Sequence, residues 1–187
     1  MAWSPPTPRP GHPYYMHDAI YAQPGAIRLV LRKNAETLKA VAAHLKTVDQ
    51  VLLSGIGTSW HACLVGELLL SQIGRLGHRV RAFHSFEFKN YWPDPDPRTG
   101  VIVVSHRGTK RFSLEALQKA KAGGGVGVAI TGLGSGEGLE IADYLLTTVE
   151  QENSAAHTIS YTTALSLLAA LAAEIGGDEE TRNVSRR

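Results

Sequence analysis

The sequence has 187 residues and a mass of 20.2 kDa, which fits one ordinary domain better than two. Its 19 basic and 17 acidic residues leave a formal charge of +2, too small a surplus for a polybasic nucleic-acid-binding protein. With 43% hydrophobic and 19% charged residues, the composition excludes a disordered chain, and its apolar stretches are interrupted well short of the ~20 residues of a membrane span.

Prolines dominate the first part of the chain. Five of the nine fall within the first 13 residues, where they oppose helix formation and interrupt any apolar core of a signal peptide. We therefore assign residues 1–25 to a proline-rich N-terminal arm. After Pro24, apolar residues recur at helical spacing from Ile27 to Leu45 and predict the first helix. The domain itself is expected to span residues 26–177, followed by a charged tail or linker over 178–187.

Beyond residue 50, short apolar runs alternate with helical patterns. The predicted strands are 51–54, 79–83, 101–104, 126–130 and 144–147, and the second, which is the most polar, is expected near a sheet edge. The predicted helices are 60–73, 113–122 and 162–175. Continuous apolar strands that alternate with helices indicate a parallel sheet covered on both faces. The predicted class is α/β: a doubly wound, flavodoxin-like three-layer α-β-α sandwich with a five-stranded parallel sheet.

Two loops rich in small and hydroxyl residues, 55–59 and 105–110, leave buried strands and enter helices. In a doubly wound sheet the ligand lies at the carboxyl ends of the strands, where the strand order reverses. A helix N-terminus there offers unpaired N–H groups and the positive end of a dipole, which suit an anion. Arg107, Lys110 and Arg111 are unfavourable in the first turn of a helix unless an anion is present. These loops predict a phosphate site, with ordinary helix caps as the alternative.

Competing cofactor and metal motifs fail on particular residues. The stretch 55–57 begins like a dinucleotide fingerprint, but Trp60 stands where the third glycine is needed. His61 and Cys63 lack the second pair of ligands that a zinc site requires. We expect no metal and no cofactor. The lone Cys63 is predicted to be a buried small hydrophobic residue, and its lack of a disulfide partner favours a cytoplasmic location.

Several stretches of the chain together resemble the sugar isomerase (SIS) domain, and among such domains the first one in the isomerase half of glutamine–fructose-6-phosphate aminotransferase. They are GTSWHA at 57–62, SFEFK at 85–89, VSHRGT at 104–109, and the segments 16–27 and 152–165. The likeness therefore runs in order along most of the chain, from about residue 16 to residue 175.

The resemblance implies which residues surround a phosphosugar. In the family, a Gly-Thr-Ser loop and a Ser-Gln-Ser-Gly-x-Thr loop hold the phosphate. Here His106 replaces the glutamine, Arg107 the second serine and Lys110 the threonine, so a cradle of hydroxyl groups becomes partly cationic. The phosphosugar-binding residues implied are Gly57, Thr58, Ser59, Ser105, His106, Arg107, Gly108, Thr109, Lys110 and Ala155, the last through its backbone.

Enzymes of this family have two such domains in tandem, and their acid/base glutamate, ring-opening histidine and catalytic lysine belong to the second domain and the tail. The resemblance thus implies a phosphosugar-binding SIS domain, the first half of a two-domain isomerase or aminotransferase-like protein acting on hexose 6-phosphates, and a homodimer or higher homo-oligomer. One alternative is a phosphosugar-sensing module without catalysis. Another is a stand-alone aldose–ketose isomerase, in which Glu87 or Glu152 would be the base and His61 would open the sugar ring.

Overall fold

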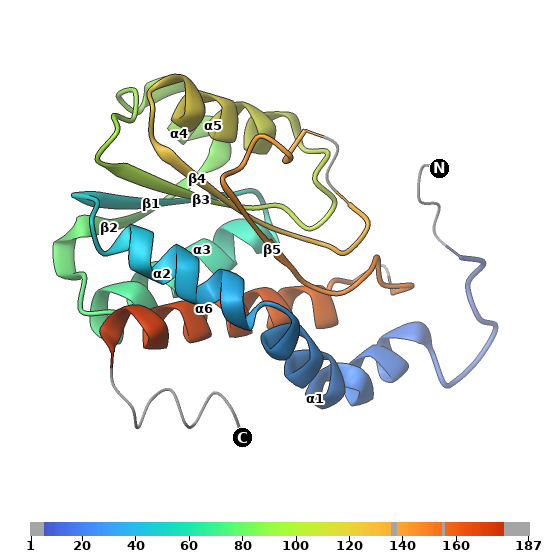
Figure 1. The fold of residues 1–187 in the computed structure, drawn as a ribbon. Coiled ribbons are helices and arrows are strands. Elements are labelled where there is room, and N and C mark those ends of the chain that lie inside the picture. The colour runs from blue at the N-terminus through green and yellow to red at the C-terminus, as the bar shows by residue number, and fades with distance from the viewer. Residues whose placement is uncertain (1–5, 136–137, 155, 178–187) are drawn as a thin grey trace.

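A computed structural model describes residues 6–135, 138–154 and 156–177. Its centre is a five-stranded, all-parallel sheet in the order β2-β1-β3-β4-β5 (Figure 1). The strands are β1 (Gln50–Gly55), β2 (Val80–His84), β3 (Thr99–Val104), β4 (Val126–Thr131) and β5 (Tyr144–Thr147). The helices are α1 (Tyr15–Lys33), α2 (Ala35–Leu45), α3 (Thr58–Gln72), α4 (Ser85–Tyr91), α5 (Arg111–Ala122) and α6 (Ile159–Gly176), with a short 3-10 turn at Gly77–Arg79.

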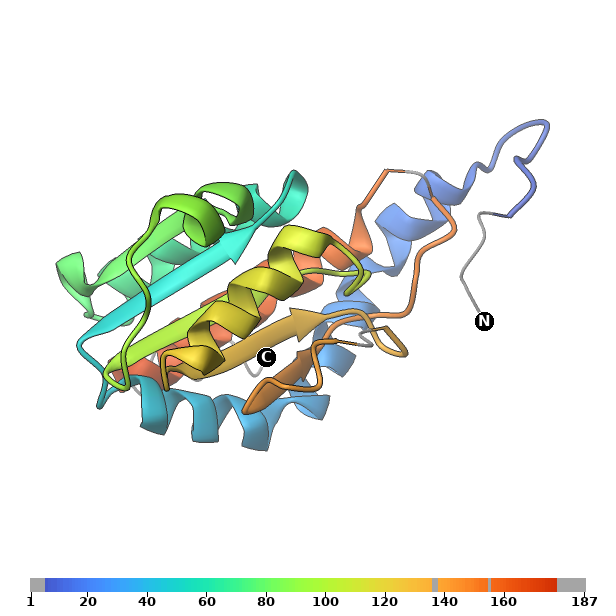
Figure 2. The same ribbon diagram turned by 90° about the horizontal axis from the view of Figure 1, so that it is seen from above.

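Helices cover both faces of the sheet, as the apolar strands predict. Figures 1 and 2 show α4 and α5 over one face, and α2, α3 and α6 over the other, while the N-terminal half of α1 extends past the sheet. The predicted doubly wound α/β sandwich is confirmed, and β2 lies at an edge as expected. Strand order reverses between β1 and β3, because β2 lies on one side of β1 and β3 on the other.

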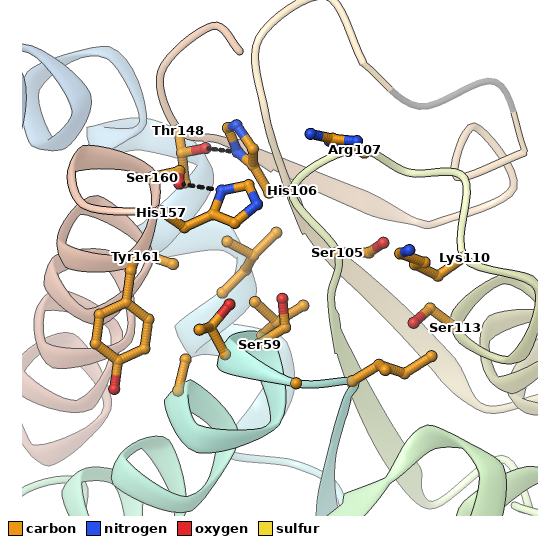
Figure 3. A pocket seen from close by; sticks show the side chains of 17 residues that line it. Ser59, Ser105, His106, Arg107, Lys110, Ser113, Thr148, His157, Ser160 and Tyr161 are labelled. Atoms are coloured by element: carbon orange, nitrogen blue, oxygen red, sulfur yellow. Dashed lines mark hydrogen bonds between the residues drawn. The ribbon is translucent and has the colours of Figure 1, made fainter. Parts of the chain in front are cut away.

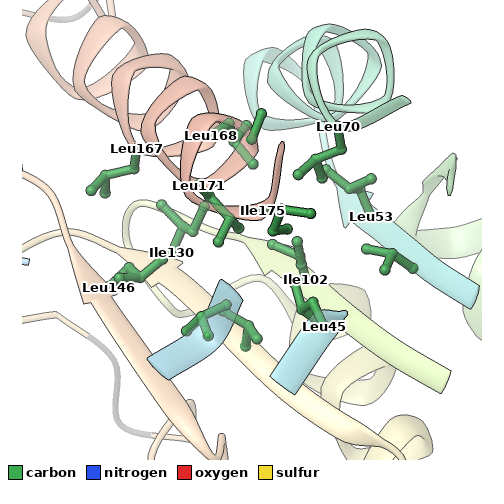
Figure 4. Packing of buried hydrophobic residues seen from close by; sticks show 14 of the residues in the cluster. Leu45, Leu53, Leu70, Ile102, Ile130, Leu146, Leu167, Leu168, Leu171 and Ile175 are labelled. Atoms are coloured by element: carbon green, nitrogen blue, oxygen red, sulfur yellow. The ribbon is translucent and has the colours of Figure 1, made fainter. Parts of the chain in front are cut away.

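The side chains of each central strand alternate between two cores. Leu53 and Ile102 pack against α6, which contributes Leu168 to the same core (Figure 4). Leu52 and Val101 point to the other face and pack under α4 and α5. This alternation explains why the strands are apolar throughout. Although α6 is long and apolar enough to cross a membrane, more than half of it is buried, and it packs against α1, α2 and α3 in the manner of a core helix.

The start of the first helix differs from the sequence-based expectation. Helix α1 begins at Tyr15 and runs through Pro24, so part of the predicted arm is helical. Pro24 has no N–H to donate to the carbonyl of Ile20, and the Gln23 side-chain amide donates to that carbonyl at 3.1 Å instead. The predicted single helix also breaks at the buried Asn34.

Asn34 ties this break to the sheet. Its amide nitrogen donates to the carbonyls of Val30 and Thr147, and its amide oxygen accepts from the Thr147 N–H.

Helix α4 was not predicted, and it has only seven residues. Its C-terminal end is held from outside by Lys119, whose ammonium group donates to the carbonyls of Phe88, Lys89 and Trp92. The predicted tail 178–187 lies outside the described residues.

Candidate functional site

A cavity of about 340 Å³ opens at the carboxyl ends of β1 and β3, where the strand order reverses. The start of α3, the loop between β3 and α5, and the start of α6 form its walls (Figure 3). Seven of the ten predicted binding residues line it: Gly57, Thr58, Ser59, Ser105, His106, Arg107 and Lys110. Gly108 and Thr109 do not line it, and Ala155 lies outside the described residues.

Glycines allow the β1–α3 loop to turn tightly onto the cavity. A side chain at Gly55 would place its Cβ 2.6 Å from the backbone carbonyl of Ser59, so only glycine fits this approach. Gly57 precedes the helix with φ +60°, a conformation that costs other residues free energy. As a result, α3 begins directly behind β1 and directs its first turn, with Thr58 and Ser59, at the cavity.

Ser105 provides the most informative polar group of the β3–α5 loop. Its side chain lies at the end of β3 and the residue is only 3% exposed, yet its hydroxyl has no hydrogen-bond partner among the described residues. A buried hydroxyl without a partner costs about 1–3 kcal/mol. Because Ser105 lines the cavity beside Lys110, a bound anion would satisfy this group (Figure 3).

Two cations line this end of the cavity and a third does not. Lys110 is exposed, and its ammonium group has no hydrogen-bond or ion-pair partner within the described part of the chain. Arg107 also lines the cavity. Arg111, which the sequence grouped with them, instead forms an ion pair with Glu115 at 2.7 Å, one helical turn further along α5.

A chain of buried serine hydroxyls supports the same end of the cavity. Ser54, at the end of β1, donates to Ser85 at 2.9 Å, and Ser85 lies 3.3 Å from Ser113 in the first turn of α5. Ser113 lines the cavity, although sequence reasoning did not select it. The chain links β1, α4 and α5 at the point where the strand order reverses.

The opposite end of the cavity carries two imidazole rings. His106 and His157 lie edge to face with their centroids 5.7 Å apart. Burial, with a further contribution from the neighbouring His157, lowers the pKa of His106 to about 4, so the ring is neutral near pH 7. Its Nδ1 lies 3.3 Å from the Thr148 hydroxyl, and its Nε2 is buried without a partner among the described residues.

Glu152 caps α6 and does not line the cavity. Its carboxylate accepts hydrogen bonds from the backbone N–H groups of Thr158, Ile159 and Ser160 and from the Ser160 hydroxyl. The side chain is only 5% exposed, so these bonds take up its accepting capacity in place of water. The two other candidates for catalysis, Glu87 and His61, are exposed and also lie outside the cavity lining.

Sequence reasoning left several lining residues unselected: Ser113, Thr148, His157, Ser160 and Tyr161. The last three belong to the segment 152–165, whose likeness to SIS domains was the one signal that pointed to them.

No cluster of metal-binding side chains occurs among the described residues. Cys63 is fully buried, as predicted, and burial raises the pKa of its thiol.

The model of the SIS domain family matches residues 44–174, which is most of the chain. The chain belongs to the SIS domain family. A glutamine–fructose-6-phosphate aminotransferase from Thermococcus kodakarensis is 32% identical over 167 residues, covering 88% of this chain and 27% of that protein. The corresponding Pyrococcus horikoshii protein is 31% identical, covering 89% of this chain and 28% of its own length.

Solved structures show the same fold. The C-terminal domain of glucosamine-fructose-6-phosphate aminotransferase from Francisella tularensis superimposes with a TM-score of 0.79 at 18% identity, over 96% of this SIS chain and 53% of that one. The sugar isomerase domain of an RpiR transcription factor from Sphaerobacter thermophilus gives 0.71 at 20% identity, over 91% and 94%. The SIS chain thus spans about 27% of the curated relative from Thermococcus but most of the regulator domain.

Proposed function

We propose that the cavity between α3, the β3–α5 loop and α6 binds a phosphosugar, with the phosphate at the end formed by Ser59, Ser105 and Lys110. The observation that carries this proposal is the buried, unpartnered hydroxyl of Ser105 next to a cation that has no ion-pair partner among the described residues. Two helices begin at this end, α3 and α5, and their dipoles favour an anion.

Calorimetric titration tests the proposal. Fructose 6-phosphate and inorganic phosphate should bind, and unphosphorylated fructose should not. Ser105→Ala removes a hydroxyl that has no partner among the described residues, so the fold should survive. The variant should bind more weakly by about 1.5–3 kcal/mol, the usual worth of a hydrogen bond to a charged group. Lys110→Met should weaken binding similarly, whereas Lys46→Met, at an exposed lysine after α2, should not. Equal affinity for fructose and its phosphate would contradict the proposal.

We further propose that the ligand is a hexose 6-phosphate and that the chain is the first half of a two-domain protein acting on it. The names of the aminotransferase relatives support this, since they state fructose 6-phosphate as a substrate. The small share of those relatives that the chain spans agrees with it. A cytoplasmic location is part of the same proposal, in keeping with these metabolic enzymes.

A sensing module is the second candidate. No aspartate or glutamate among the described residues lines the cavity, so these residues place no carboxylate base within hydrogen-bond reach of a bound sugar. Two fold neighbours are regulators: the RpiR domain and a Vibrio vulnificus NanR protein solved with ManNAc-6P, at a TM-score of 0.70. Deuterium exchange at C1 of fructose 6-phosphate, followed by NMR, separates the candidates, because a sensor binds the sugar without exchanging its carbon-bound protons.

A further inference from the structure

A line of three polar side chains runs from the start of α6 into the cavity. The Ser160 hydroxyl donates to the Glu152 carboxylate, and Nδ1 of His157 lies 3.0 Å from the same hydroxyl and 3.6 Å from the carboxylate. Ser160 is buried, while the His157 side chain is 30% exposed. Figure 3 shows the second ring nitrogen of His157 facing across the cavity toward Ser105 and Lys110.

The hydrogen bonds of Ser160 fix which ring nitrogen of His157 carries the imidazole proton. A serine hydroxyl has one proton, and an ionised carboxylate can only accept, so the proton of Ser160 is directed to Glu152. The Ser160 oxygen must therefore accept from His157, which requires a proton on Nδ1. In the neutral ring this leaves Nε2 with a free lone pair on the cavity side.

The ring of His106 is held in the same way, by the Thr148 hydroxyl. The Thr148 hydroxyl donates its one proton to the carbonyl of Thr131 at 3.1 Å, so it accepts from Nδ1 of His106 at 3.3 Å. Both rings are thereby held in one tautomer, with Nε2 as an acceptor. This end of the cavity therefore differs in chemistry from the Lys110 end: it offers acceptors for hydroxyl donors, whereas the Lys110 end offers donors for an anion.

We propose that His157 recognises the sugar portion of the bound phosphosugar, with its Nε2 accepting a hydrogen bond from a sugar hydroxyl, and that Ser160 and Glu152 position the ring for this role. The inference rests on the proposed phosphosugar function and adds the second half of the binding site. It defines the ligand class as a polyhydroxy phosphate that presents a hydroxyl donor on the side away from its phosphate.

Nitrogen-15 NMR of the histidine rings tests the tautomer without any ligand. Near pH 7.5, His157 should carry its proton on Nδ1 in the wild-type protein. Ser160→Ala should lose this preference, and Ser160→Thr, which keeps the hydroxyl, should retain it. A proton on Nε2 of wild-type His157, or an unchanged tautomer in Ser160→Ala, would overturn the positioning role.

Titrations with two ligands then isolate the sugar contact. His157→Phe keeps a ring but has no acceptor, so the affinity for fructose 6-phosphate should fall by about threefold to tenfold, as for one lost hydrogen bond. The affinity for inorganic phosphate should stay constant, because phosphate does not reach this end. In Lys110→Met both affinities should fall together.

The outcomes separate the two proposals. If fructose 6-phosphate and phosphate bind to the wild-type protein and His157→Phe weakens both equally or neither, the role of His157 is wrong and the phosphosugar site stands. If neither ligand binds to the wild-type protein, the phosphosugar function fails and the sugar-recognition role fails with it.

Discussion

Removing the Glu152 carboxylate should destabilise the protein by about 2–4 kcal/mol. In Glu152→Ala the N–H groups of Thr158, Ile159 and Ser160 lose their shared acceptor, and the Ser160 hydroxyl loses the acceptor of its proton. A helix cap alone is worth about 0.5–2 kcal/mol, and a hydrogen bond to a charged group about 1.5–3 kcal/mol. The range lies below the simple sum of these bonds because water can reach the partly exposed Thr158 after the change.

Urea unfolding followed by circular dichroism measures this difference. Glu152→Gln keeps the shape and one acceptor oxygen but brings an N–H₂ group toward backbone donors, so its stability should fall between wild type and Glu152→Ala. Glu150→Ala, at an exposed glutamate of the same segment, is the matched control and should stay within about 0.5 kcal/mol of wild type. If Glu152→Ala is as stable as Glu150→Ala, the capping role of Glu152 is refuted.

Three further predictions address packing, titration and assembly. Gly55→Ala should cost about 1–3 kcal/mol and weaken phosphate binding, because its Cβ would meet the Ser59 backbone at 2.6 Å; unchanged unfolding and titration curves would contradict this. Because burial lowers the pKa of His106 to about 4 from the ordinary 6.5, the unfolded chain takes up this proton first as the pH falls. Between about pH 6.5 and 4, the free energy of unfolding of the wild type should therefore fall by up to about 3 kcal/mol more than that of His106→Gln. Urea unfolding at several pH values measures this difference, and parallel pH profiles of the two proteins would disprove the prediction. Met16 and Ile20, 46% and 47% exposed on one face of α1, are expected to contribute to a homodimer; light scattering should show a dimer that dissociates in Met16→Glu/Ile20→Glu, and a monomeric wild type would refute it.

The fold could be predicted largely from local patterns. Strands buried on both faces are continuous apolar runs, and 126–130 and 144–147 nearly coincide with β4 and β5. The errors arise where a side-chain hydrogen bond decides the local structure. Pro24 remains helical because Gln23 satisfies the orphaned carbonyl, and the chain breaks at Asn34 because β5 supplies hydrogen bonds to it. Neither contact is visible as a pattern of spacing.

In the candidate site, too, the local features could be predicted from the sequence and the long-range contacts could not. The two glycine- and serine-containing loops could be found because each is contiguous in the sequence and follows a strand. The polar partner of His106 could not, since Thr148 is 42 positions from His106 and meets it only when β3, β4 and β5 are aligned. The sequence also cannot tell that Lys110 lines the cavity while the adjacent Arg111 pairs with Glu115.

The distribution of charge in the cavity bears on which chemistry this chain can supply by itself. Enolisation of a sugar phosphate needs a base at the carbon whose proton is removed. Glu152 is fully occupied by the start of α6, and Glu87 is exposed outside the cavity. Among the described residues that line the cavity, His106 and His157 carry the imidazole nitrogens that can accept a proton, and the second ring nitrogen of His157 faces across the cavity (Figure 3). Proton exchange that persists in His157→Phe would require a base from outside this cavity wall, whereas exchange that is lost, with phosphate affinity retained, would assign the chemistry to His157.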